Sequence, residues 1–228
     1  IQGRNQYISY LTSATVHSFR GYKVALDCAN GAASSIAKTV FEMLGAKTYV
    51  IHNEPNGLNI NVDCGSTHIE SLQKYVAENH LDIGFAFDGD ADRCFAVDEK
   101  GNVVDGDQIM YICACKMKEE GTLLKDTVVA TVMSNYGMEK CLAKEGIQLL
   151  RTPVGDKYVS MEIMKNGYSI GGGKYGQYIF YKKNTTGDGV FTGIKMMGNE
   201  VGKKTILFFL STPLSLVPLL FFDTRRDR

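Results

Sequence analysis

Three aspartates alternate with small residues in the segment FAFDGDADRC, directly after an apolar run. Asp88, Asp90 and Asp92 place three carboxylates within five residues, and such charges repel one another unless a cation compensates them. The small residues between them let the loop curl so that the carboxylates converge on one hard cation, and Mg²⁺ is the expected ion. Arg93 follows at once and could pair with a carboxylate or bind a substrate phosphate.

Three other uses of this loop have to be weighed. An EF-hand would place Glu99 at its twelfth position counted from Asp88, but Arg93 stands where such a loop needs glycine. A phosphatase would use a strand that ends in Asp-x-Asp, with Asp88 as the nucleophile that becomes phosphorylated. A solvated acidic turn without a ligand also stays open beside the metal site.

A glycine-rich run, GGGKYG, occupies residues 171–176 and has the spacing Gly-x-Gly-x-x-Gly. The segment after it, QYIFYK, has the pattern of a strand and not of a helix, which argues against a dinucleotide site. A glycine-rich loop between two strands still lets a ligand approach the backbone, and Lys174 offers a point charge for a phosphate. A plain hairpin explains the spacing equally well.

Two further segments, RTPVGDKYV at 151–159 and TTGDGVF at 185–191, each put a Gly-Asp step before a predicted helix. Backbone amides there could hold an anion, but capping of the helix by the aspartate is the simpler interpretation. The four histidines show no spacing typical of metal ligands, and no chemistry is assigned to them: His17, His52, His68 and His80.

Strand and helix patterns alternate along most of the chain, which predicts an α/β fold of two compact domains. Strands are expected at 22–27, 47–52, 83–88, 94–98, 127–133, 147–150, 168–170 and 177–182. Helices are expected at 32–45, 108–121, 137–146, 157–167 and after Gly189. Thr67, with Glu70 three residues on, predicts a capping box that opens one more helix, ending near His80.

Charge and cysteine content indicate which partners the protein can bind and in which cellular compartment it works. Lys plus Arg and Asp plus Glu both number 25, so the net charge of zero argues against nucleic acid as a partner. The six cysteines form no Cys-x-x-Cys pair and mostly lie in apolar runs, which favours a reducing, cytoplasmic location. No starting Met and no signal pattern are visible, so the chain is expected to begin within a longer protein.

The C-terminal segment differs from the rest. Residues 206–222 are strongly apolar, but Pro213 and Pro218 interrupt any helix, and the length is at the short end for a membrane span. A membrane partner is therefore not expected. We interpret residues 205–228 as an atypical apolar tail, either packed on a part that the sequence lacks or foreign to the rest of the gene.

Taken together, the motifs point to a family. DGDADRCFAVDEKGNVVDGD is preceded by LDCANGAAS and NEPNGLNINVDCGSTH and followed by RTPVGDKYV and TTGDGVFTG. The set closely resembles the alpha-D-phosphohexomutases, and within them the bacterial phosphoglucosamine mutases. The similarity runs from about residue 3 to about residue 204, with the motifs in the family order.

Members of that family have four domains around a central cleft, and this chain resembles the second and third, each a mixed sheet packed with helices. The resemblance implies a helical linker from a missing first domain at 1–20 and a metal-loop domain at 21–120. It implies a sugar-loop domain at 121–204, ahead of the tail. On this expectation the chain is a fragment without the first and fourth domains.

The resemblance also assigns roles residue by residue. Asp88, Asp90 and Asp92 match the loop that binds Mg²⁺ together with a phosphoserine of the first domain, and Arg93 matches the adjoining catalytic arginine. The segment from Arg151 to Lys157 matches a neighbouring active-site loop. The loop that grips sugar hydroxyls is matched by Gly172, Gly173, Lys174, Gly176 and Gln177.

The reaction implied is transfer of a phosphoryl group from phosphoserine to a hexose phosphate, reorientation of the bisphosphate, and return of the other phosphate to serine. Glucosamine 6-phosphate and glucosamine 1-phosphate are the expected substrate pair. The alternatives are a phosphomannomutase or phosphoglucomutase, or a non-catalytic module that binds Mg²⁺ and a phosphosugar.

Two departures from the family bear on activity. The sequence contains no Ser-His-Asn-Pro, the context of the family's catalytic serine, so the chain by itself is expected to be inactive. The family's sugar loop reads Gly-Glu-Gln-Ser-Gly-His, whereas Gly173 and Gln177 here replace the glutamate and the histidine, and Lys174 and Tyr175 also differ. These changes remove a carboxylate, which accepts hydrogen bonds from hydroxyls, and an imidazole, which can carry a proton.

Overall fold

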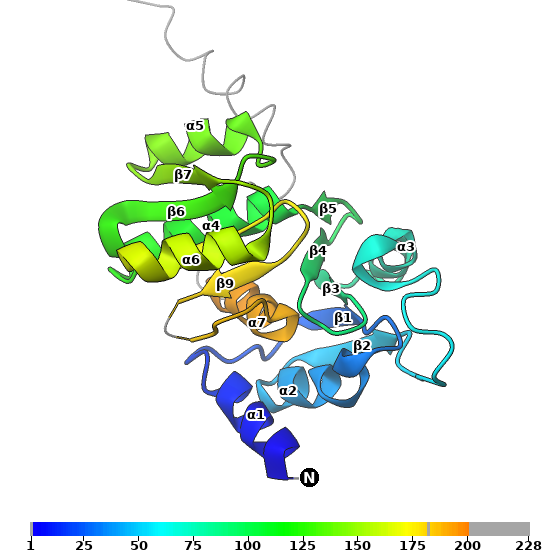
Figure 1. The fold of residues 1–228 in the computed structure, drawn as a ribbon. Helices are drawn as coiled ribbons and strands as arrows, with labels where there is room; N and C mark the ends of the chain where they lie inside the picture. The colour runs from blue at the N-terminus through cyan, green and yellow to red at the C-terminus, as the bar shows by residue number, and fades with distance from the viewer. Residues whose placement is uncertain (1, 182, 201–228) are drawn as a thin grey trace, which may run out of the picture.

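The computed structural model describes residues 2–181 and 183–200. The predicted tail at 205–228 and the last residues of the predicted sugar-loop domain lie outside the described residues. Two sheets, one after the other along the chain, form the framework (Figure 1). This arrangement confirms the predicted α/β class, with a mixed sheet and flanking helices in each half.

The first sheet has the strand order β2-β1-β3-β4-β5. Strands β1 (Lys23–Asp27), β2 (Lys47–Ile51) and β3 (Ile83–Phe87) are parallel, and β4 (Cys94–Asp98) and β5 (Val103–Val104) continue antiparallel. All residues of β3 are buried, as expected for a strand covered on both faces. The carboxyl ends of β1 and β3 lie side by side, so the loops that follow them are neighbours.

Helix α3 (Glu70–Glu78) covers one face of this sheet with Leu72 and Val76. On the other face lies α2 (Ala37–Met43), preceded by the short turn η1 (Ala32–Ser35). The sequence predicts one helix over 32–45, but Ile36 has a non-helical backbone (φ −128°, ψ −49°) that separates the two pieces.

The predicted capping box at Thr67 is wrong. Thr67 belongs to the short turn η2 (Gly65–Thr67), and α3 starts at Glu70 without a side-chain cap. A capping box does form at the start of α4 (Gly106–Glu119), where Asp105 accepts from the Gln108 amide at 3.0 Å and the Gln108 side chain accepts from the Asp105 amide at 2.8 Å.

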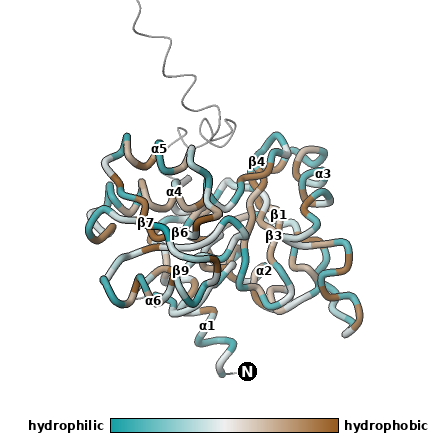
Figure 2. Tube along the Cα trace, turned by 45° about the horizontal axis from the view of Figure 1, so that its top comes forward, coloured by the Kyte–Doolittle hydropathy of each residue, from teal (hydrophilic) through white to brown (hydrophobic). Residues whose placement is uncertain are grey.

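The second sheet has the order β7-β6-β8-β9, from β6 (Thr127–Thr131), β7 (Gln148–Thr152), β8 (Ile170–Gly172) and β9 (Tyr178–Phe180). The short turn η3 (Leu124–Asp126) leads into it. Helix α6 (Asp156–Asn166) covers one face, and α5 (Tyr136–Lys144) and α4 lie on the other. Figure 2 shows the two sheets as separate lobes, with α3 and α5 at their outer sides.

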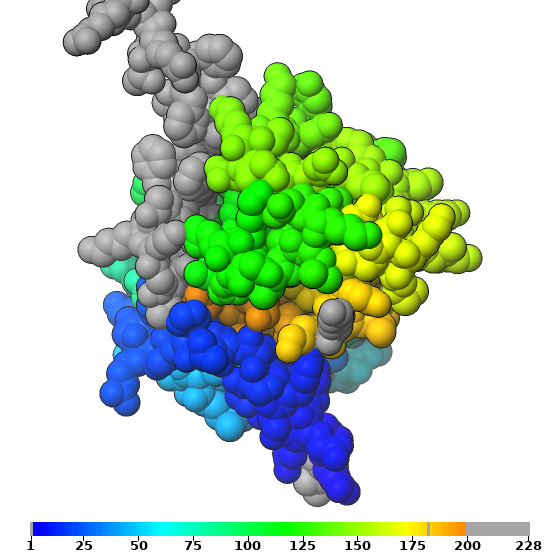
Figure 3. All heavy atoms as spheres, turned by 90° about the vertical axis from the view of Figure 1, so that its left-hand side faces the viewer, coloured from blue at the N-terminus to red at the C-terminus, as the bar shows by residue number. Residues whose placement is uncertain are grey.

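Two helices join the lobes. Helix α4 packs on β4 of the first sheet and on β8 of the second. Helix α7 (Gly189–Glu200) follows the second sheet in the sequence but packs on β3 and β4 of the first, beside α1 (Gln2–Thr12). Figure 3 shows α7 in orange between the N-terminal segment and the second lobe.

The main core therefore runs through both lobes. Phe41 and Phe85 of the first lobe, Phe180 of the second and Phe191 of α7 all belong to one buried cluster. Within the described part of the chain, the helices are too short or too polar to cross a bilayer.

Candidate active site

The aspartate loop lies between β3 and β4. Asp88 is buried, Asp92 is half-buried and Asp90 is exposed, and each offers a carboxylate oxygen within 4.8 Å of the others. Ala91 adopts a left-handed backbone (φ 62°), and its amide donates to the Asp88 carbonyl at 3.0 Å. This tight turn aims the three carboxylates at one point, the arrangement that a hard cation requires.

Arg93 offsets part of this negative charge. Its Nε lies 3.5 Å from Asp88 Oδ2 and 3.8 Å from Asp92 Oδ1. Both distances are too long for hydrogen bonds, and Nε is buried without a hydrogen-bond partner. The Arg93 amide donates to Asp88 Oδ1 at 3.1 Å. The guanidinium is thus held beside the carboxylates by charge alone and remains available to an anionic ligand.

Burial and the neighbouring charges of Asp88 and Asp90 raise the pKa of Asp92 to about 6. Below about pH 6 the metal-free loop therefore holds a proton on Asp92 that a cation has to displace, whereas near pH 7 the carboxylate is mostly ionised.

We expect Mg²⁺ binding to weaken about tenfold between about pH 7 and about pH 5, because proton and cation compete for the Asp92 carboxylate. Calorimetric Mg²⁺ titrations of the chain at the two pH values would measure this. An affinity that does not change between them would mean that Asp92 is not a ligand.

The segment that follows β1 packs directly against the aspartate loop. The Ala32 amide donates to the Gly89 carbonyl at 2.9 Å. A Cβ placed on Gly31 would lie within 2.8 Å of the Gly89 carbonyl carbon, so only glycine lets the two loops approach this closely. The sequence motif ANGA marks this contact, although nothing in its spacing indicates the partner.

The glycine-rich loop joins β8 to β9 and lies against the aspartate loop. The Gly176 carbonyl accepts from the Cys94 amide at 2.8 Å, and Arg93 and Gln177 form a bridge between the two lobes. Gln177 also donates from Nε2 to Asp92 Oδ2 at 2.9 Å. The residue that replaces the family's histidine thus binds a carboxylate of the expected metal loop directly.

A cavity of about 320 Å³ lies beside the glycine-rich loop, and Arg93, directly after the aspartate loop, reaches its wall. Its walls include Arg93, Gly172, Gly173 and Gln177 of the predicted site, together with Thr131 and Gly155. The volume is in the range of a small-ligand site. The structure therefore brings the expected arginine and part of the expected sugar loop together in one hollow.

The other predicted binding residues lie elsewhere among the described residues. Arg151 on β7 donates to Glu139 at 3.0 Å and to the Ser134 carbonyl at 2.8 Å, which ties α5 to the turn after β6. Lys157 and Lys174 are exposed side chains outside the cavity wall, and Gly176 is also not part of that wall.

Two further aspartates, the buried Asp107 and the half-buried Asp188, hold local structure in ways that the sequence did not fully indicate. Asp107 accepts from the Asn135 amide at 2.6 Å and fixes the turn that carries Ser134. Asp188 caps α7 by accepting from the Phe191 amide at 2.9 Å and accepts from the Tyr7 hydroxyl at 2.8 Å. Burial raises the pKa of both carboxyls. Capping, the simpler interpretation of both Gly-Asp steps, is confirmed at Asp188. It is wrong at Asp156, which lies inside α6, because that helix starts after Gly155 without a side-chain cap.

Comparison with known families matches nearly all of the described chain. Residues 5–101 match the model described as phosphoglucomutase/phosphomannomutase, alpha/beta/alpha domain II, and residues 105–204 match that of domain III. A curated phosphoglucosamine mutase of Lachnoclostridium phytofermentans is 56% identical over 221 residues, covering 97% of this chain and 49% of that protein. One of Bacillus subtilis is 48% identical over 224 residues, covering 98% and 50%.

Solved structures show the same fold. A phosphoglucomutase/phosphomannomutase family protein of Burkholderia thailandensis superposes with a TM-score of 0.81 at 20% identity, covering 98% of this chain and 52% of that one. An Aspergillus fumigatus N-acetylphosphoglucosamine mutase in complex with GlcNAc-6P and magnesium gives 0.73 at 18% identity, covering 90% and 49%. The chain spans about half the length of the curated relatives it matches.

Proposed function

Since the chain belongs to the phosphoglucomutase/phosphomannomutase family and carries its domains II and III, we propose that it is the metal-loop and sugar-loop half of a phosphoglucosamine mutase. The family predicted from the motifs is confirmed by these matches. The proposed reaction interconverts glucosamine 6-phosphate and glucosamine 1-phosphate. The observation that carries the proposal is the convergence of three carboxylates beside a cavity lined by Arg93 and the glycine-rich loop.

The aspartate loop fits the Mg²⁺ that we propose for it. Asp88, Asp90 and Asp92 present oxygen ligands, which this cation prefers, and their mutual repulsion favours a bound cation. When bound, Mg²⁺ supplies positive charge that stabilises a phosphoryl group during its transfer. Below about pH 6 the ion would displace a proton from Asp92, and the Gln177 amide holds the Asp92 carboxylate in place.

In this proposal the cavity binds and orients the hexose phosphate. The Arg93 guanidinium, held by charge and not by hydrogen bonds, pairs with the phosphate. The backbone of Gly172 and Gly173 lines the cavity and faces the sugar hydroxyls. The phosphoryl group moves from a serine phosphate of the first domain to the free sugar hydroxyl. The bisphosphate turns, and the other phosphate returns to the serine.

The curated relatives reported above are named phosphoglucosamine mutases, which favours this activity over the phosphomannomutase and phosphoglucomutase alternative. A cytoplasmic location is part of the proposal, and the six free cysteines fit it.

A chimera tests the proposal. Residues 2–204 would replace the matched half of the Bacillus subtilis enzyme, which supplies the remaining domains, and turnover would be followed on glucosamine 6-phosphate, glucose 6-phosphate and mannose 6-phosphate. We expect turnover of the first substrate above the other two. A folded chimera that turns over only glucose or mannose phosphate, or none of the three, would contradict the proposed function.

A further inference from the structure

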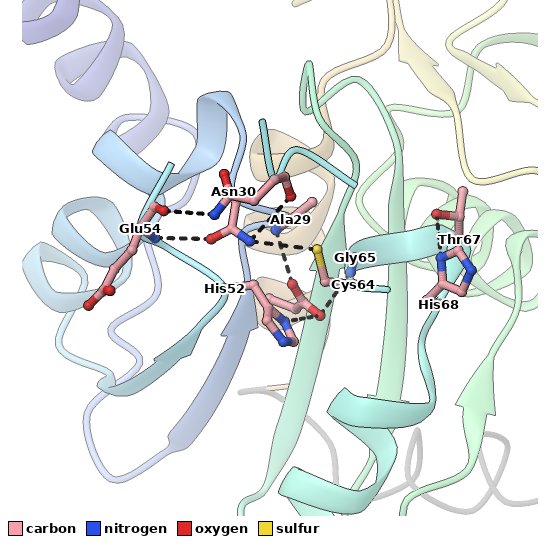
Figure 4. A network of polar contacts seen from close by, with 10 residues as sticks. Ala29, Asn30, His52, Glu54, Cys64, Gly65, Thr67 and His68 are labelled. Carbon is pink, nitrogen blue, oxygen red and sulfur yellow. Dashed lines mark hydrogen bonds and ion pairs between the residues drawn. The ribbon is translucent and has the colours of Figure 1, made fainter. Parts of the chain in front are cut away.

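A second cluster of metal-ligating side chains lies at the carboxyl ends of β1 and β2, apart from the aspartate loop. Asp27 ends β1, His52 follows β2 directly, and Cys64 precedes η2. A carboxylate oxygen, a ring nitrogen and the thiol sulfur of these residues all lie within 4.8 Å of one another. Figure 4 shows the His52 ring and the Cys64 sulfur on the two sides of the carboxylate that also contacts Gly65.

Two of the three side chains in the cluster are shielded from water, and the third is partly exposed. Asp27 and Cys64 are fully buried, whereas the His52 side chain keeps 32% of its surface exposed. The Asp27 carboxylate accepts from the Ala29 amide at 3.0 Å and the Gly65 amide at 2.9 Å, and these contacts fix its position. A buried carboxylate needs a compensating positive charge, and among the described side chains His52 is the one group within ion-pair distance.

His52 does not provide that compensation by a hydrogen bond. Its Nδ1 lies 3.0 Å from Asp27 Oδ2, yet this buried nitrogen has no hydrogen bond of acceptable geometry. The backbone of His52 is also held in the left-handed region (φ 49°), which non-glycine residues adopt at a cost. A ring nitrogen so close to a carboxylate and a thiol, but without a hydrogen bond to either, is placed as a ligand would be.

We propose that Asp27, His52 and Cys64 form a binding site for Zn²⁺. Sulfur, nitrogen and oxygen donors together are typical of zinc, whereas the three carboxylates of the aspartate loop suit magnesium. The ligand atoms of a tetrahedral zinc site lie about 3.5 Å apart. The ligand atoms of the cluster lie within 4.8 Å of one another, so they would draw together around the ion, and a water molecule from the exposed side of His52 would complete the coordination.

His52 and Cys64 are the residues directly before and after the loop of residues 53–63. A bound ion would therefore link the two ends of this loop. The loop reaches the aspartate loop: a Cβ placed on Gly89 would meet the Ile60 and Asn61 side chains at 2.7 Å. The Asn61 amide also donates to the Ala29 carbonyl at 3.0 Å. Zinc would therefore stiffen the support of the aspartate loop without touching its carboxylates.

Cobalt is the probe that separates the two sites. The reduced 228-residue chain would be titrated with Co²⁺ in the presence of excess Mg²⁺, and the thiolate-to-cobalt charge-transfer absorption would be followed. An oxygen-only site gives no such band. We expect a band that saturates at one equivalent, is removed by Zn²⁺, is lost in Cys64→Ser, and is kept in Cys28→Ser, a buried neighbouring thiol outside the cluster.

His52→Asn guards against a Cys64 variant that fails to fold. Asparagine tolerates the left-handed backbone of this position better than most residues, so circular dichroism and unfolding of the metal-free variant should match the parent chain. We expect its Co²⁺ affinity to fall at least tenfold. The absence of a thiolate band in the parent chain, or a band and affinity unchanged by both substitutions, would overturn the site.

Discussion

Replacing Asp90 with alanine is expected to weaken Mg²⁺ binding by the 228-residue chain about 100-fold, because two carboxylates would then have to hold the ion. Asp90 is the exposed member of the three, so its removal leaves the buried contacts of Asp88 intact. The loss also relieves repulsion in the metal-free loop, and the raised pKa of Asp92 should fall toward its ordinary value.

Calorimetry gives the affinity, and nuclear magnetic resonance of the carboxyl carbons gives the pKa of Asp92. Glu78→Gln is the matched control, since it removes one negative charge from an exposed position on α3, away from the loop. The control should bind Mg²⁺ as the parent chain does. If Asp90→Ala behaved like the control, the loop would be an acidic turn and not a metal site.

Replacing Phe191 with alanine should destabilise the chain by about 4 kcal/mol, close to a thousandfold change in the folding equilibrium. Phe191 is fully buried on α7. Its ring lies 5.3 Å from that of Phe180 in the second sheet and 5.9 Å from that of Tyr10 on α1, centroid to centroid. The cavity left by the substitution would therefore open where three parts of the chain meet.

Urea unfolding followed by circular dichroism measures this effect. Phe191→Leu, which keeps most of the volume, should cost much less, and the exposed Met161→Ala on α6 should change stability by less than about 0.5 kcal/mol. A loss below about 1 kcal/mol in Phe191→Ala would show that neighbouring side chains fill the space and that α7 does not anchor the core.

The fold could be predicted to a large extent because its signals are local. Continuous apolar runs such as 83–87 mark buried strands, and the alternation with helices fixes the class. The packing of α7 on the first sheet could not be predicted, since the apolar pattern of a helix indicates which face is buried but not against which sheet. The capping box predicted at Thr67 is wrong because a contact between distant residues, which local sequence does not indicate, determines the backbone there. The Gly65 amide is held by Asp27, and this long-range contact shapes the turn.

The aspartate loop was visible in the sequence because its ligands lie within five residues. The cluster of Asp27, His52 and Cys64 was not, because its members are separated by 24 and 11 intervening residues (28–51 and 53–63) and meet only when β1 and β2 pair in parallel. The roles of Arg151 and Lys157 rested on the family resemblance, and that of Lys174 on the glycine-rich loop and the resemblance together. Their distance from the cavity follows from side-chain directions that sequence spacing does not encode.

The packing of α7 on β3 and β4 also has a consequence during synthesis of the protein. About 100 residues separate β3 from α7, and a ribosome adds roughly 5 to 20 residues each second, so α7 is completed about 5 to 20 s after the strands it covers. For that time part of the apolar face of the first sheet lacks its partner. The newborn chain thus presents a surface that chaperones can bind, and the first half reaches its final packing only after the second half has been made.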